Sequence, residues 1–85
     1  MEESKGGLSA VVERFPGNGE ILRRLFESNQ SFQSLCNEYE ACLTALKYWQ
    51  QSNLPEALDF RNEFSTLLVE LEDEILEHLR KETPS

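Results

Sequence analysis

The side chains that could do chemistry are concentrated near residue 78, where the histidine of this chain follows a run of carboxylates. His78 is the only histidine among the 85 residues. A carboxylate-bridged metal site in a helical bundle needs a Glu-x-x-His motif on each of two helices, whereas the residue three before His78 is Ile75. The pattern therefore favours a half-buried histidine near a helix end over a metal ligand.

The carboxylates around this histidine could bind a divalent cation or act as an acid and base pair. They are Glu70, Glu72, Asp73, Glu74 and Glu77. Helical spacing spreads them over a solvated flank rather than around a concave site, and no loop rich in Gly or Asn accompanies them. We therefore predict no catalytic and no metal-binding residue. A solvated surface and a docking surface for a basic partner remain as alternatives.

Two further motifs resemble reactive or ligand-binding sites. Cys36 and Cys42 would lie about 9 Å apart on one helix, which is too far for a disulfide. No Cys or His pair at ligand spacing accompanies them, so we expect buried thiols, with a reactive or metal-binding thiol as the alternative. The segment Gly17-Asn18-Gly19 lacks the preceding strand and the Lys-Ser/Thr of a phosphate loop. The sequence predicts no cofactor.

Length and charge limit the kind of protein. With 85 residues the chain holds at most one small domain, and nucleic acid or an anionic membrane would repel its net charge of −8. No apolar run approaches the roughly 20 residues that span a bilayer, and the amino-terminal segment MEESKGG has no signal-peptide pattern. We expect a cytoplasmic protein that binds neither nucleic acid nor membranes.

Hydrophobic spacing predicts an all-α fold with one helical domain over residues 8–82, between a flexible lead at 1–7 and a tail at 83–85. The expected helices are two short ones and two long ones, at about 8–15, 18–27, 30–51 and 55–81. Because about three residues join the long helices, we expect an antiparallel hairpin on which one or both short helices pack.

The caps of the long helices have clear sequence signals. Ser28 and Asn29 are both suited to cap the first long helix, because their side-chain oxygens can accept from a free backbone N–H. Asn53 and Glu56 form a capping box around Pro55, which is tolerated in a first turn and predicts the start of the second long helix.

Apolar residues recur on one face of each long helix and define the predicted seam between them. The seam residues are Phe32, Leu35, Tyr39, Leu43, Leu46, Phe60, Phe64, Leu67, Leu71 and Ile75. Two helices alone rarely bury enough apolar surface to offset the entropy of ordering them, so the wide faces need more cover. The short helices, a second copy of the chain, or both would supply it.

A second apolar set lies nearly opposite the seam of the last helix. It consists of Leu58, Val69 and Leu76. Together with the acidic flank, these residues form a candidate interaction surface, whose charged members are Glu70, Asp73, Glu74 and Glu77. Isolated exposed apolar residues are normal, so ordinary surface is the alternative to an oligomer contact.

Two segments, ILRRLFESNQSFQSLCNEYEACLTAL and LVELEDEILEHLRKE, share a pattern of Asn before Phe-x-x-Leu, an aromatic residue one turn later, and a closing Leu-x-Asp-Glu-Ile. This pattern resembles that of the YdcH family of small bacterial proteins. The matching residues are Leu25, Asn29, Phe32, Leu35, Tyr39, Leu71, Asp73, Glu74 and Ile75. The resemblance implies a helical hairpin of unknown function, without catalytic or cofactor residues.

Two features depart from the family pattern. Glu72 occupies a position where the family usually has Lys, which leaves the acidic run unneutralised. The amphipathic arm at residues 8–15 has no counterpart, and its spacing does not say whether it packs on its own chain or on another. Eight residues are too few for a stable isolated helix, so the arm must dock to form.

These patterns favour a non-enzymatic protein that interacts with other proteins or with itself, in a coiled-coil-like manner. The first alternative is a chaperone-like adaptor that holds a partner helix or a basic partner surface. The second is a metal-binding or enzymatic protein, for which the sequence offers no site.

Overall fold

The computed structural model describes residues 7–82 and consists of helices and the turns between them. The helices are α1 (Leu8–Arg14), the short 3₁₀ helix η1 (Pro16–Asn18), α2 (Gly19–Ser28), α3 (Gln30–Gln50) and α4 (Ala57–Glu82). The predicted all-α class is confirmed, and each α-helix ends within two residues of its predicted boundary. The predicted tail at 83–85 and all of the predicted lead except Gly7 lie outside the described residues.

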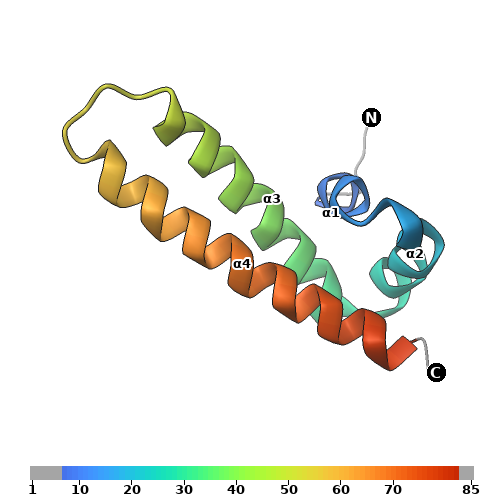
Figure 1. The fold of residues 1–85 in the computed structure, drawn as a ribbon. Coiled ribbons are helices and arrows are strands. Elements are labelled where there is room, and N and C mark those ends of the chain that lie inside the picture. Colours follow the sequence, from blue (N-terminus) through green and yellow to red (C-terminus); the bar gives the residue numbers. More distant parts are fainter. Residues whose placement is uncertain (1–6, 83–85) are drawn as a thin grey trace.

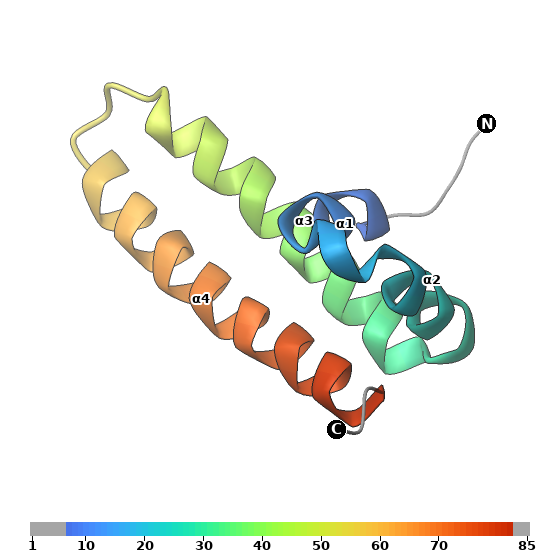
Figure 2. The same ribbon diagram turned by 45° about the vertical axis from the view of Figure 1, so that its right-hand side comes forward.

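The helices form two layers. In one layer α3 and α4 lie side by side and run in opposite directions (Figure 1). In the other, α1 and α2 cover one face of this pair, towards the end where α3 begins and α4 ends (Figure 2). The second layer is shorter than the first, so part of the α3–α4 pair lies outside its cover.

The junction between α2 and α3 is a single residue held by side-chain caps. The Asn29 side chain accepts a hydrogen bond from the Phe32 backbone N–H at 3.1 Å, so Asn29, of the two predicted candidates, is the N-cap. The Gln33 side chain donates to the Phe26 carbonyl at 2.6 Å, which satisfies a free acceptor at the end of α2. These two bonds allow the chain to turn sharply and place α2 against α3.

The start of α4 differs from the prediction. The first helical residue is Ala57, not Pro55, and six residues (51–56) join the long helices instead of three. The residue before a proline is disfavoured in the helical region, which keeps Leu54 out of the helix. The Leu54 N–H donates to the Ser52 hydroxyl at 3.1 Å, and the Ala57 N–H donates to the Leu54 carbonyl at 3.0 Å. The predicted box between Asn53 and Glu56 does not begin the helix.

Five of the predicted seam residues are buried, and they join residues of α1 and α2 in one core. The five are Phe32, Leu35, Tyr39, Leu71 and Ile75. Leu43, Leu46 and Phe64 are half-buried against them. The short helices contribute Leu8, Val11, Leu22 and Leu25 to the same cluster. In this structure of a single chain, the arm packs on α3 and α2 of that chain.

Two residues of the predicted seam are exposed rather than buried. Phe60 is 36% exposed and Leu67 is 40% exposed. Both lie on the edge of α4 that α1 and α2 do not cover. Leu68, the residue after Leu67, is buried instead. Phe60 stacks on Trp49 of α3, with ring centroids 4.4 Å apart and an angle of 19° between the rings.

Candidate functional site

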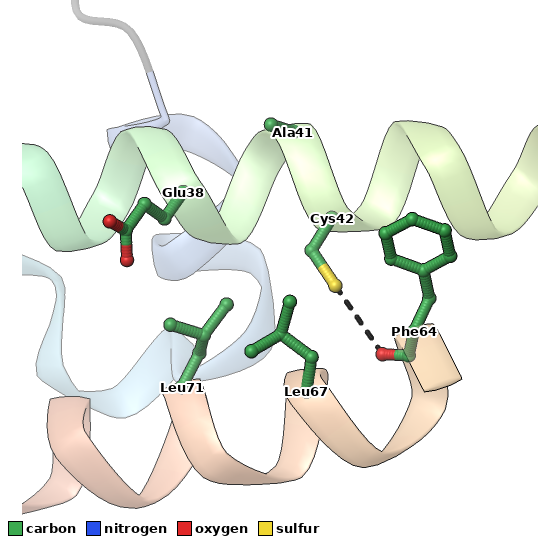
Figure 3. A pocket seen from close by; sticks show the side chains of 6 residues that line it. All are labelled: Glu38, Ala41, Cys42, Phe64, Leu67 and Leu71. Carbon is green, nitrogen blue, oxygen red and sulfur yellow. Dashed lines mark hydrogen bonds between the residues drawn. The ribbon is translucent and has the colours of Figure 1, made fainter. Parts of the chain in front are cut away.

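The face of the α3–α4 pair away from α1 carries an open apolar groove of about 370 Å³. Figure 3 shows Leu67 and Leu71 of α4 directed towards α3, with the short helices behind the pair. The lining residues are Glu38, Ala41, Cys42, Phe64, Leu67 and Leu71. The groove thus has large apolar side chains on its α4 wall and two small ones on its α3 wall.

The polar groups of this groove are poorly suited to catalysis. The Cys42 thiol donates a hydrogen bond to the Phe64 carbonyl at 3.3 Å, and burial raises the pKa of this thiol (Figure 3). A raised pKa keeps the sulfur protonated near neutral pH, whereas a cysteine nucleophile acts as the thiolate. Glu38 is the carboxylate in the lining, and it is exposed. The groove is suited to binding an apolar surface.

The opposite face is closed by α1, which is fixed to α3 at its first residues. The Gly7 N–H donates to the Asn37 side-chain oxygen at 3.0 Å. The backbone at Gly7 lies so close to α3 that a methyl group added there would overlap the Cys36 carbonyl oxygen. Glycine is therefore required for this close approach. Leu8 follows directly and is buried.

Glu72 joins three helices on the covered side. Its carboxylate accepts from Arg14 of α1, at 3.0 Å from Nε and 3.3 Å from Nη2, and from the Tyr39 hydroxyl of α3 at 2.8 Å. Burial and this hydrogen bond raise the pKa of Tyr39 to about 12. The hydrogen bond and charge of Glu72 also raise the pKa of Arg14. We refer to Arg14, Tyr39 and Glu72 as the polar clamp.

The polar clamp shows that the predicted solvated position of Glu72 is wrong. It also connects Glu72 with the amino-terminal arm, two features that the sequence presents separately. Glu72 does not belong to a solvated acidic flank, because it is a half-buried acceptor with two partners. The glutamate and the arm are the two departures from the family pattern, and in the structure the arm supplies the arginine that neutralises the glutamate. A charge that the local sequence leaves unpaired is thus paired over a separation of 58 residues.

The predicted interaction residues are exposed but do not line the groove. Leu58, Val69 and Leu76 lie on a different side of α4 from Leu67 and Leu71. The acidic members are all exposed, and Glu77 pairs with Arg80 at 3.5 Å. The acidic members are Glu70, Asp73, Glu74 and Glu77. The apolar stripe of Leu58, Val69 and Leu76 is therefore separate from the groove, whereas Glu74 shares the side of α4 that carries Leu67.

The remaining candidates for chemistry have structural surroundings. His78 is half-buried and packs edge to face with Phe32, with ring centroids 5.2 Å apart. Both cysteines are buried and free of disulfides. Within residues 7–82, no three His, Cys, Asp or Glu side chains gather in a way that could hold a metal ion.

The sequence pattern missed several residues of the groove and of its opposite face. Ala41 and Glu38 fall outside the apolar arc of α3, so helical spacing alone gives no signal for them. Gly7 and Arg14 acquire their roles from contacts with distant residues. A glycine next to the first apolar residue of a short helix is the only local sign of the close approach.

No match was found among protein-family models, curated proteins or solved structures. The resemblance to the YdcH family therefore stays a prediction. None of the helices in the described part of the chain is long and apolar enough to cross a membrane.

Proposed function

We propose that this protein is a non-enzymatic interaction module that binds a helix of another protein in the groove between α3 and α4. The observation that carries the proposal is the exposure of Phe60 and Leu67 beside an apolar groove on a face that α1 and α2 leave uncovered. Phe60 is 36% and Leu67 is 40% exposed, so burying what remains in a complex yields on the order of 1 kcal/mol each.

The shape of the groove supports a helical partner. Two helices that lie side by side form a groove into which a third can place its apolar face, as in many helix-in-groove complexes. Ala41 and Cys42 on the α3 wall are small, which allows a partner backbone to approach closely. Phe64 and Leu67 supply a bulky wall opposite them.

The non-enzymatic part of the proposal rests on the chemistry of the groove. Its thiol is held protonated by burial and is engaged with a backbone carbonyl. Membership of the YdcH family, which the sequence motif predicts, would add no catalytic residue to this picture. A helical hairpin with an apolar groove is then the functional unit.

Self-association is the second candidate function, and it is favoured by a separate surface. Leu58, Val69 and Leu76 are exposed at spacings of eleven and seven residues, which keep them on one line along α4. Arg80 and Asp73 lie beside this line, so two copies can place opposite charges together. A coiled-coil-like dimer would use this stripe and leave the groove open.

Site-specific photocrosslinking in the native cell tests both candidates. A photoreactive phenylalanine analogue replaces Leu67 in the groove, Leu76 in the stripe, or Glu20 on α2 as the control. If the groove binds a helix of another protein, position 67 alone should give a discrete crosslink to another polypeptide. Self-association predicts a crosslinked homodimer from position 76. If positions 67 and 76 give only the background of position 20, the interaction function is wrong.

A further inference from the structure

Charge around the groove indicates which kind of helix it accepts. We propose that the α3–α4 groove binds an amphipathic helix with an apolar face flanked by Lys and Arg, in preference to a second copy of this chain. The inference rests on the proposed function, because it names the partner class of the same groove.

The apolar length of the groove fits a short helical segment. From Phe64 to Leu71 the α4 wall extends over seven residues, or about 10 Å at the rise of an α-helix. That length corresponds to about two turns of a partner helix lying along it. The α3 wall, which includes Ala41 and Cys42, leaves room for the partner's backbone. A helix with Leu-type residues at i, i+3, i+4 and i+7 would match this surface.

Three charged groups on the rim of the groove are acidic. Glu38 lines it from α3. On α4, Glu63 and Glu74 are exposed and lie within about 40° of Leu67 at 100° per residue. No ion pair holds these three carboxylates within residues 7–82, where the ion pairs are Arg14 with Glu72 and Arg80 with Glu77.

Of the basic residues on the long helices, Lys47 lies away from the groove and Arg61 lies near its amino-terminal end on α4. Lys47 is about 140° around α3 from Cys42, whereas Arg61 is half-buried and about 60° around α4 from Phe64. Lys81 shares the side of Leu67 but comes ten residues after Leu71, about 15 Å beyond the end of the groove. Three carboxylates and one guanidinium thus lie around the groove, so the net charge at its rim is negative.

This distribution disfavours a second copy as the occupant. Two copies packed groove to groove would bring Glu38, Glu63 and Glu74 of each close to those of the other, and like charges at an interface are strongly unfavourable. The net charge of −8 adds to the repulsion. A helix with Lys or Arg beside its apolar face would gain attraction at the same positions, and faster association.

Two synthetic peptides test the preference. Both are amphipathic helices with the same Leu spacing; one has Lys on its flanks and the other has Glu. Titration calorimetry should show binding of the Lys-flanked peptide to the full chain, weakening with added salt, and at least about tenfold weaker binding of the Glu-flanked peptide.

Matched variants locate the binding. Leu67→Ser in the groove and Leu76→Ser outside it replace leucines of nearly equal exposure, 40% and 39%, on the same helix. Leu67→Ser should lower the affinity for the Lys-flanked peptide about tenfold or more. Leu76→Ser should lower it by no more than about twofold. The double variant Glu38→Gln/Glu74→Gln should reduce both affinity and salt dependence. The control variant Glu20→Gln/Glu27→Gln removes the same amount of charge from α2. It should change the affinity and its salt dependence only by the small amount that any equal change in net charge produces.

Each other outcome has a definite meaning. If both peptides bind equally and the Leu67→Ser variant binds neither, the charge preference is overturned. The groove would then still be a helix-binding site. A homodimer that Leu67→Ser dissociates, seen by sedimentation, would overturn the inference in favour of a second copy. Equal effects of Leu67→Ser and Leu76→Ser, or binding of neither peptide, would also overturn it. Crosslinking from position 67 then decides the proposed function independently.

Discussion

The two faces of the α3–α4 pair are built from similar apolar residues, yet one is closed and the other is open. On the closed face, Val11 and Leu22 from the short helices reach full burial against the pair. On the open face, Phe60 and Leu67 remain partly exposed beside the groove. The difference teaches that an apolar stripe on a long helix does not become core by its own composition. The position of a short docked segment decides which part is buried.

The closed face is held by specific contacts as well as by apolar burial. A helix as short as α1 is unstable alone, so its structure depends on docking. Gly7 permits the close approach at one end, and the polar clamp fixes the other end through Arg14. Nothing comparable occupies the open face within the described residues, which is why we assign binding to that side.

The largest expected effect separates two leucines of the same groove. Leu71 is buried, whereas Leu67 is 40% exposed one turn before it. Leu71→Ala should lower the free energy of unfolding by about 2–5 kcal/mol, as for a packed core leucine. Leu67→Ala should cost less than about 1 kcal/mol, since less of its surface leaves water on folding. Chemical denaturation measures both, and equal losses would show that the open face is part of the core.

A smaller effect is expected where α1 meets α3. Gly7→Ala forces the arm away from the Cys36 carbonyl and should cost about 1–3 kcal/mol, limited by what docking of α1 contributes. Gly17→Ala is the control, because no atom lies within 4 Å of an added Cβ there. Hydrogen exchange should show loss of amide protection in Val11–Arg14 for Gly7→Ala alone. Unchanged protection would mean that the arm is not held by this contact.

The polar clamp should make stability sensitive to alkaline pH. The pKa of Tyr39 is raised from 10.0 to about 12, so the folded state retains a proton that the unfolded chain loses. This stabilisation is complete below pH 10 and is lost as the pH rises towards 12. Tyr39→Phe should cost about 0.5–1.5 kcal/mol at neutral pH and flatten the decline above pH 10. Parallel pH profiles for both proteins would contradict the role of Tyr39.

The smallest expected effect is a difference in thiol reactivity between the two faces. Burial raises the pKa of Cys36 on the covered side to about 12, from an ordinary value of 9.0. Cys42 borders the groove, and burial raises its pKa as well. Because Cys42 is reached through the open face, iodoacetamide should modify it before Cys36, as read by mass spectrometry of timed samples. Faster labelling of Cys36 would indicate that α1 undocks readily.

Much of the fold could be predicted from local pattern. The spacing of Phe32, Leu35 and Tyr39 placed them in the core, and Asn29 marked the start of α3. These features depend on helical periodicity and on hydrogen bonds between near neighbours, both of which are written within a few residues. The start of α4 was predicted two residues early, because Pro55 is compatible both with a first helical turn and with the loop before it.

The groove was harder to predict because it lies on the face of the α3–α4 pair that neither short helix covers. A helical wheel assigned Phe60 and Leu67 to the seam together with Leu71, since all three lie within one apolar arc. The wheel carries no information on which part of that arc the short helices cover. Glu72 was likewise placed with its acidic neighbours, although its partners Arg14 and Tyr39 come from other helices.

By itself, the sequence determined the all-α class, the helix order and most of the core, because these follow from periodicity along the chain. The tertiary structure alone decided which side of the α3–α4 pair is closed, that Arg14 neutralises Glu72, and that the remaining apolar edge forms a groove lined by Phe64 and Leu67. These depend on contacts between residues far apart in sequence, whose pairing no local spacing specifies.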